Sequence, residues 1–319
     1  MSELLELKKI RRDYFRHKKA VLVIGFFDGV HIGHVKIIKE CIEAAKKING
    51  SSVVFTFDKP PVNVVKSRIK KKLIVSFEEK ISLMEGLGVD CMVSAEISPE
   101  FLMLKPERFC RDILLNKIYV KEIFVGSGFR FGNRAQGDIP FLKEFFKPYD
   151  VRVNVIPLLK VGGEIVSSTS IRKYYSAGKI EKIARLLGRK PQVEGEVIRG
   201  SGRGKRLGFP TANIDISEIN ATPGDGVYLG RVMAGGCKDK IFDSLINIGN
   251  NPTFNDNRRL VEVFILNFND NIYGGKIRIT FLKKLRDEIK FTGEAGLIKQ
   301  IKLDIKSAEK YFKVKRQQE

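Results

Sequence analysis

The sequence predicts an α/β domain built on a doubly wound parallel sheet, followed by a small antiparallel β-barrel with a C-terminal helix. In the first half, apolar strand-like runs alternate with stretches of helical periodicity, which is typical of parallel strands joined by helices. In the second half, short alternating or β-branched runs are separated by turns rich in Gly, Pro and Asn. With 319 residues, the chain is long enough for two domains of roughly 100–200 residues each.

The first half holds five expected strands. They cover residues 20–26, 52–57, 91–94, 122–125 and 151–156. Ligands bind such a sheet beyond the carboxyl ends of its strands. The turn after the first run and the glycine-rich segment 126–137 both fall there, so we expect them to share one crevice.

Two helical stretches, residues 170–177 and 180–187, close this half. Gly188-Arg189-Lys190-Pro191 interrupts the second stretch, and the pattern changes beyond it. We therefore place the two domains at residues 1–187 and 188–319. The expected barrel strands are 192–198, 211–216, 226–232, 244–248, 260–266 and 276–282, and residues 293–312 have the spacing of a helix that packs against them.

Composition narrows the function classes. Lys and Arg number 58 against 37 Asp and Glu, a formal net charge of +21, which favours polyanionic partners such as nucleotides or nucleic acid. Basic runs are more often solvated surfaces, and no nucleic-acid-binding motif accompanies them. No apolar stretch approaches the ~20 residues of a membrane helix, and residues 1–19 are charged and do not resemble a signal peptide. We expect a soluble, cytoplasmic protein that does not bind membranes.

The cysteines predict neither disulfides nor a zinc site. Cys41, Cys91, Cys110 and Cys237 are scattered, no CxxC pair occurs, and only 3 histidines are present. We expect reduced and mostly buried thiols.

His31 and His34 stand where the first apolar run meets glycines and then an amphipathic helix. Both imidazoles therefore lie at a helix N-terminus, where free backbone N–H groups and the helix dipole favour anions. Gly25 permits a tight turn, Gly33 allows close approach of a ligand, and an imidazole can donate a hydrogen bond to phosphate. The alternative is an ordinary helix start with two partly exposed histidines.

The order of strand, glycines and HxGH resembles both the adenylyl-transferring nucleotidyltransferases and the class I aminoacyl-tRNA synthetases. A synthetase also carries a KMSKS-like loop, which is absent. Ser167-Ser168-Thr169-Ser170-Ile171-Arg172 instead resembles the ISSTxIR signature of small-molecule adenylyltransferases. Ser168 and Thr169 precede the expected helix, so we expect their hydroxyls to cap it while Arg172 reaches bound phosphate. A plain capped surface helix is the alternative.

Residues 200–214 form a glycine-rich basic stretch that contains Gly202, Lys205, Gly208 and Pro210. Glycines and cations of this kind wrap phosphates, although a flexible connection is also consistent with the composition. Thr211 and Asn213 alternate onto one strand face and offer two oxygen ligands suitable for Mg²⁺.

Taken together, these motifs resemble the prokaryotic bifunctional riboflavin kinase/FMN adenylyltransferase family, the FAD synthetases, over nearly the whole chain. The likeness rests on segments 25–34 (GFFDGVHIGH), 168–172 (STSIR), 205–213 (KRLGFPTAN), 226–228 (GVY), 247–254 (NIGNNPTF), 261–263 (VEV) and 285–288 (LRDE), which occur in the family's order.

For the first domain, the resemblance implies transfer of AMP from ATP to FMN, with release of pyrophosphate and no covalent intermediate. His31 and His34 lie near the triphosphate, with Gly25, Phe27, Asp28 and Gly33 forming the nucleotide turn. Ser168, Thr169 and Arg172 act from the other side. Phe129 and Phe131 contact the flavin, and magnesium assists.

For the second domain, the resemblance implies phosphorylation of riboflavin to FMN. Glu262 is the general base, Thr211 and Asn213 hold magnesium, and Arg286 contacts flavin or phosphate. From the residues alone, Glu262 is a lone carboxylate in an apolar strand, which is also typical of an exposed strand position. A surface ion pair of Arg286 with Asp287 or Glu288 is the alternative for that arginine.

The chain departs from the family pattern at three places. Many members have Asp or Asn at the position of Gly128, in a loop that helps to hold FMN. The frequent DPHP stretch is Asp58-Lys59-Pro60-Pro61, and the histidine that often follows the Glu-Val pair is Phe264.

Three other functions are also consistent with the sequence. They are an adenylyltransferase for another phosphorylated small molecule, a kinase with weakened FAD synthesis, and, from a different class, a nucleic-acid or regulatory flavin-binding module.

Overall fold

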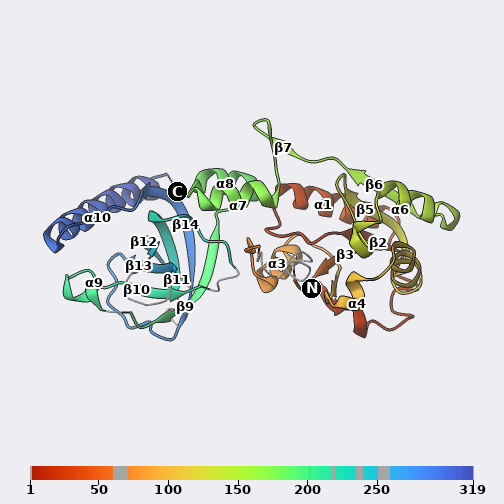
Figure 1. The fold of residues 1–319 in the computed structure, drawn as a ribbon, viewed down its shortest axis with the longest axis horizontal. Coiled ribbons are helices and arrows are strands. Elements are labelled where there is room, and N and C mark those ends of the chain that lie inside the picture. The colour runs from red at the N-terminus through yellow and green to blue at the C-terminus, as the bar shows by residue number, and fades with distance from the viewer. Residues whose placement is uncertain are drawn as a thin grey trace. The chain divides into compact units, whose positions relative to one another are not determined.

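The computed structural model describes residues 2–59, 71–200, 202–216, 220–234, 240–250 and 259–318. They form two compact units, Met1–Ser168 and Thr169–Glu319 (Figure 1). Pro60, Pro61, Cys237 and the 251–254 part of the motif that begins at Asn247 lie outside the described residues. Among the described helices, none is both long enough and apolar enough to cross a membrane.

A six-stranded sheet organises the first unit, and all of its strand pairs are parallel. The strand order is β1-β4-β3-β2-β5-β6. Chain order reverses between β2 and β5, so this boundary is the topological switch point where ligands bind in doubly wound folds. The strands are β1 (Glu3–Glu6), β2 (Ala20–Ile24), β3 (Ser51–Phe57), β4 (Cys91–Ala95), β5 (Val120–Gly126) and β6 (Arg152–Ile156).

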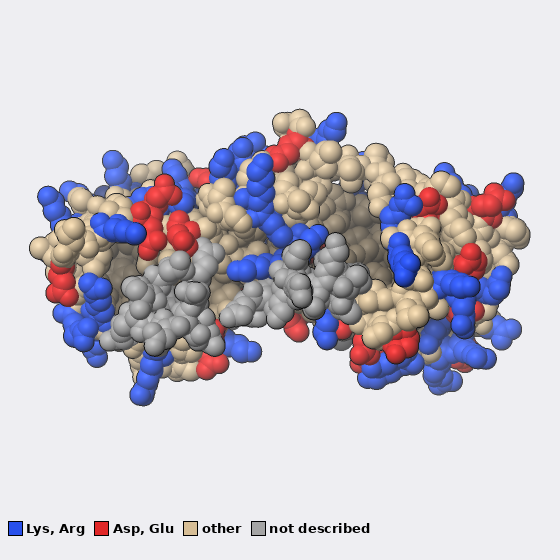
Figure 2. Space-filling model, viewed as in Figure 1, with Lys and Arg blue, Asp and Glu red and all other residues tan. Residues whose placement is uncertain are grey.

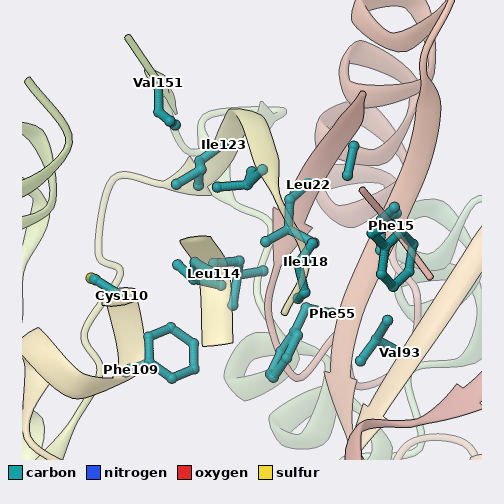
Figure 3. Packing of buried hydrophobic residues seen from close by; sticks show 14 of the residues in the cluster. Phe15, Leu22, Phe55, Val93, Phe109, Cys110, Leu114, Ile118, Ile123 and Val151 are labelled. Atoms are coloured by element: carbon teal, nitrogen blue, oxygen red, sulfur yellow. The ribbon is translucent and has the colours of Figure 1, made fainter. Parts of the chain in front are cut away.

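Both faces of this sheet are buried, as the continuous apolar strands predict. Leu22 and Phe55 point into one core with Phe109 and Leu114, part of which Figure 3 shows. Val21, Val23 and Val54 point to the opposite face and pack against other helices. The five expected strands are confirmed, whereas β1 was missed because its charged sequence forms the edge of the sheet and pairs with β4 alone.

Helices connect the strands of the first unit, and one short hairpin follows the last strand. The α-helices are α1 (Ile32–Lys47), α3 (Phe77–Glu85), α4 (Pro99–Leu102), α5 (Pro106–Arg108) and α6 (Ile139–Phe146). A π-helix, η2 (Phe109–Leu115), follows α5, and the 3-10 turns are η1 (Leu7–Lys9), η3 (Asn133–Ala135) and η4 (Lys147–Tyr149). The hairpin β7 (Lys160–Val161) and β8 (Glu164–Ile165) follows β6.

The second unit is a closed antiparallel barrel with strand order β10-β13-β12-β11-β14-β9, which confirms the predicted class. Its strands are β9 (Gln192–Ile198), β10 (Ala212–Asp215), β11 (Gly226–Ala234), β12 (Ile241–Asn250), β13 (Arg259–Ile265) and β14 (Lys276–Arg286). The short helix α9 (Arg203–Arg206) lies between β9 and β10. Ala308 and Phe312 of α10 (Glu294–Arg316) pack on the barrel, as its helical spacing predicts.

Two further helices, α7 (Ser168–Ser176) and α8 (Ile180–Leu187), precede the barrel. Gly188 adopts a left-handed conformation with φ 73° and ends α8, and its N–H donates to the carbonyl of Ala184. The helices group with the barrel, so the compact units divide ahead of them. The domain boundary at 187/188 stays a prediction.

Candidate active sites

The first site is the turn that joins β2 to α1. Phe27 and Val30 have positive φ values of 54° and 38°, and Gly29 has a φ of 83°. A Cβ at Gly25 would lie 2.7 Å from Cζ of Phe27, so glycine is required for Phe27 to fold back over the strand end. The N–H of Val30 then closes the turn on the carbonyl of Phe27 at 3.1 Å. This strained backbone places His31 at the start of α1.

His31 is the N-cap of α1. Its Nδ1 accepts a hydrogen bond from the backbone N–H of His34 at 3.2 Å. The nitrogen that accepts carries no proton, so a neutral His31 ring is protonated on Nε2 and can donate there to an anion. Gly33 lies beside the ring, since a Cβ there would be 3.2 Å from its Cε1 and Nδ1.

The two imidazoles stack, with ring centroids 3.5 Å apart and planes inclined by 17°. Phe27 meets the other side of His34 edge-on at 5.3 Å. Burial, together with the neighbouring His31 and Lys80, holds the pKa of His34 well below its ordinary value. Its Nδ1 is buried and has no hydrogen-bond partner among the described residues. His34 is therefore a neutral ring.

Asp28 and Ser168 secure this turn from two directions. The carboxylate of Asp28 is buried and accepts from the backbone N–H of Ile74 at 2.9 Å. The backbone carbonyl of Asp28 accepts from the Ser168 hydroxyl at 2.9 Å. The structure thus joins the HxGH turn to the first residue of the second motif, across most of the unit's sequence.

The capping role expected for Ser168 and Thr169 is wrong. Helix α7 begins at Ser168, so both residues lie within its first turn and not before it. The Ser168 hydroxyl donates to the backbone carbonyl of Asp28. Thr169 and Arg172 belong to the second compact unit. Their place opposite the histidines stays a prediction.

The loop after β5 supplies an aromatic surface. Phe129 stacks on the buried Phe131 with ring centroids 5.4 Å apart and planes inclined by 17°. Phe131 fits because Gly137 has no side chain, since a Cβ there would lie 2.7 Å from the ring. Gly128 is exposed, and a Cβ there would meet nothing within 4 Å. The site therefore has room for the side chain that Gly128 lacks.

The second site is a row of residues that crosses the barrel strands. Asn213 of β10 pairs with Glu262 of β13, which pairs with Asn247 of β12. Asn247 in turn pairs with Val227 of β11, and Val227 pairs with Arg286 of β14. Directly opposed residues point to the same face of a sheet. Glu262, Asn213, Asn247 and Arg286 therefore share one face.

The basic glycine-rich stretch passes over one end of this row. A Cβ at Gly200 would lie 2.0 Å from the amide nitrogen of the buried Asn213. One at Gly204 would lie 3.1 Å from the Thr211 hydroxyl. The stretch thus closes on both expected magnesium ligands. Its other predicted members, Gly202, Lys205, Gly208 and Pro210, are exposed around α9.

Phe264 lies on the same face as Glu262, because it follows two residues later on the strand. It meets Phe209 of the glycine-rich stretch at 6.3 Å, with the rings inclined by 72°. Where many family members have a histidine, this chain therefore has a packing contact that holds the loop beside Glu262.

Arg286 is tied to the C-terminal helix. Its Nε and Nη2 donate to the carboxylate of Asp304 on α10 at 2.7–3.1 Å, and its Nη1 donates to the carbonyl of Asp287. The alternative of a surface ion pair with Asp287 or Glu288 is wrong, because the partner is the buried Asp304. The contact of Arg286 with flavin or phosphate stays a prediction.

Family comparisons match both halves of the chain. Residues 14–170 match the FAD synthetase family, and residues 187–312 match the riboflavin kinase family. The chain belongs to the bifunctional riboflavin kinase/FMN adenylyltransferase family. Bifunctional riboflavin kinase/FMN adenylyltransferase of Buchnera aphidicola from Schizaphis graminum is 35% identical over 96% of each chain. Those of Listeria monocytogenes (95% of this chain, 96% of the relative) and Escherichia coli (92% of each) are 33% and 30% identical.

A solved structure shares the fold over nearly the whole chain. It is described as a macrolide-efflux protein from Streptococcus pneumoniae, and it matches with a TM-score of 0.85 and 27% identity over 96% of this chain and 98% of that chain. Its description differs from the names of the sequence relatives, and the likeness shows a shared fold.

Two residues of this family member were not singled out by the sequence reasoning. Asn247 lies in a motif that carried the resemblance, but only the strand register places it beside Glu262. Lys80 is 3% exposed on α3. In the sequence, Lys80 stands at the helical spacing that places Phe77 and Met84 toward the core, and this spacing is the pattern that could have indicated its burial.

Positive charge is spread over the surface. Figure 2 shows Lys and Arg side chains interspersed with Asp and Glu on the visible face of both units.

Proposed function

We infer that the chain converts riboflavin to FAD in two steps at two separate sites, one in each unit. The barrel phosphorylates riboflavin to FMN, and the α/β unit adenylylates FMN with release of pyrophosphate. The observation that carries this assignment is that each family motif set converges on one place. One set meets at the β2–α1 turn, and the other at the Asn213–Glu262–Asn247 row.

In the adenylyl transfer, the FMN phosphate attacks the α-phosphorus of ATP directly. His31 donates from Nε2 to a phosphate oxygen, and the N-terminus of α1 adds its dipole. Gly25, Phe27, Asp28 and Gly33 shape the turn, and Ser168 fixes it through the Asp28 carbonyl. The protein contributes positioning and charge stabilisation, so no residue becomes covalently modified.

The other groups of this site act on the two substrates. Thr169 and Arg172, which follow Ser168 at the start of α7, bind the ATP phosphates. Phe129 and Phe131 lie against the flavin. Neutral His34 stacks under His31 and holds its ring plane, and its unpartnered Nδ1 binds the nucleotide.

In the kinase step, Glu262 accepts the proton of the ribityl 5′-hydroxyl as that oxygen attacks the γ-phosphorus of ATP. Gly202, Lys205, Gly208 and Pro210 hold the ATP phosphates. Asn247 lies on the Arg286 side of Glu262 and binds the ribityl chain. Arg286 binds the flavin from the α10 end of the row.

Thr211 and Asn213 fit magnesium because their oxygen atoms are the hard ligands that this cation prefers. Gly200 and Gly204 have no side chains, so their backbone packs closely beside Asn213 and Thr211. When bound there with ATP, magnesium neutralises phosphate charge. No cluster of three His, Cys, Asp or Glu side chains suited to a metal occurs in the described part of the chain.

A kinase with weakened FAD synthesis is the second candidate, and the open space at Gly128 favours it. Separate assays of the two half-reactions distinguish the candidates. Glu262→Gln should abolish riboflavin phosphorylation while FAD formation from supplied FMN is kept, and His31→Ala should do the reverse. Wild-type protein that makes no FAD from saturating FMN, ATP and magnesium would establish the kinase-only function.

A further inference from the structure

Lys80 is a buried cation beside the adenylyl-transfer site. Its ammonium donates to the carbonyl of Phe26 at 3.3 Å, to Oγ1 of Thr56 at 3.1 Å and to the carbonyl of Phe57 at 2.8 Å. All three acceptors are neutral. The ammonium also lies over the rings of Phe26 and Phe77, 4.5 and 5.0 Å from their centroids. The charge is therefore held by dipoles and aromatic faces rather than by a bound carboxylate.

These contacts link the carboxyl ends of two neighbouring strands, β2 and β3. Phe26 directly precedes the strained Phe27, where the nucleotide turn begins, and Thr56 and Phe57 end β3. The Thr56 hydroxyl donates to the same Phe26 carbonyl at 3.2 Å. Lys80 thus fixes the backbone from which His31 is presented.

The positive charge of Lys80 acts electrostatically on His34. It is one of the causes that lower the pKa of His34, after burial and His31. Burial lowers the pKa of Lys80 itself to about 8, against the opposing effect of Asp28 and Asp58. A fold that needed only to fill this space would use an apolar side chain, because burying an ammonium is unfavourable. The unfavourable burial of this ammonium therefore indicates that its charge has a functional role.

We propose that Lys80 is a positioning residue for adenylyl transfer, whose ammonium fixes the Phe26–His31 turn and supplies positive charge at the edge where the ATP phosphates bind. The inference rests on the proposed placement of FMN adenylylation at His31. It predicts that the step requires protonated Lys80.

Protonation gives this role a signature in the pH profile. The groups that act on Lys80 are Asp28 from the turn and Asp58 from the end of β3, and Lys80 in turn acts on His34. Carboxylates titrate in the acid range, and His34 is already neutral at pH 7. The buried thiols, with pKa values raised by burial to about 12, titrate far above. We therefore expect adenylylation to decline as the pH rises past about 8, and Lys80→Arg tests whether Lys80 is the group responsible.

The test measures FMN adenylylation and riboflavin phosphorylation separately, from pH 6.5 to 9.5, for wild type, Lys80→Met and Lys80→Arg. Lys143→Met, an exposed lysine on α6, is the matched control. We expect Lys80→Met to lower kcat for adenylylation at least tenfold with a smaller change in KM, and to leave the kinase and the control within twofold of wild type. Lys80→Arg should restore part of the rate and remove the alkaline loss, because arginine stays protonated.

Adenylylation within twofold of wild type in Lys80→Met would overturn the proposal. So would an alkaline loss that is the same in wild type and Lys80→Arg. If Lys80→Met fails to fold by circular dichroism, the profiles of wild type and Lys80→Arg decide. His31→Ala is assayed alongside: if it retains FAD synthesis, the site assignment itself has failed, whereas an inactive His31→Ala beside an active Lys80→Met refutes only the role of Lys80.

Discussion

The backbone N–H of His34 donates to Nδ1 of His31, and the two imidazole rings stack 3.5 Å apart. This pairing makes the helix cap and the phosphate donor the same side chain. The cap occupies Nδ1, so the neutral ring presents its proton from Nε2. The histidine spacing therefore has a structural reason, since residue N3 of the helix supplies the N–H that orients the N-cap ring.

Replacing His31 should remove FAD synthesis selectively. His31→Ala loses both the cap and the Nε2 donor, and loss of one preorganised donor lowers the rate by roughly 10²–10³-fold. We expect that loss in the rate of FAD formation from FMN, with riboflavin phosphorylation unchanged. His17→Ala, at the exposed third histidine, is the control. A His31→Ala rate within fivefold of wild type would contradict the role.

His34 should make the protein less stable in acid. Its pKa is well below the ordinary value because the ring is buried. In mild acid, the unfolded chain therefore binds a proton on this residue, whereas the folded chain does not. The free energy of unfolding therefore falls as pH drops below about 6.5, by about 1.4 kcal/mol per pH unit from this residue. Urea unfolding at pH 7.0 and 5.5 tests this. His34→Phe keeps an aromatic ring but cannot titrate, and it should lose that part of the pH dependence; an unchanged dependence would contradict the assignment.

Gly128→Asn should strengthen FMN binding in the adenylylation step. The position is exposed, has open space and needs no positive φ, so the side chain fits without strain. A hydrogen bond to a charged phosphate is worth about 1.5–3 kcal/mol, so KM for FMN should fall roughly tenfold or more. Gly128→Ala, which adds no donor, should leave KM unchanged. Equal KM values for all three proteins would show that this loop does not hold FMN.

The Arg286–Asp304 pair should stabilise the docking of α10 on the barrel. The two side chains are 19% and 7% exposed, and Gln300 also donates to Asp304. Removing one partner of a buried pair costs about 3–5 kcal/mol, because the other charge is left without compensation. Asp304→Ala should lower the free energy of unfolding of the second unit by that order. Asp304→Leu combined with Arg286→Met should lose less than Asp304→Ala alone, and a larger loss would contradict this account.

The sequence was sufficient for most of the fold because its apolar patterns match the burial. Leu22 and Val23 alternate between two covered faces, and Val261 and Val263 alternate with Glu262 along a barrel strand. Strand β1 escaped prediction because edge pairing with β4 requires no apolar run. The closing of the barrel and its register depend on long-range pairing, which periodicity does not encode.

The candidate sites were predictable only where a local pattern carried them. His31 and His34 follow a strand and begin a helix, so their neighbourhood is visible in the sequence. The contact of Ser168 with Asp28 joins distant segments, and local periodicity does not indicate it. The pairing of Arg286 with Asp304 and the burial of Lys80 likewise come from tertiary packing. In all three cases a polar side chain has its hydrogen-bond partner on another element of the fold.

We expect the two separate sites to act in sequence, and a mixing experiment tests this order. Glu262→Gln and His31→Ala proteins are incubated with riboflavin, ATP and magnesium, separately and together, and the flavins are resolved by chromatography. The account predicts no product from Glu262→Gln alone, FMN without FAD from His31→Ala alone, and FAD from the mixture. A mixture that stops at FMN, although Glu262→Gln folds, would contradict the assignment of one activity to each unit.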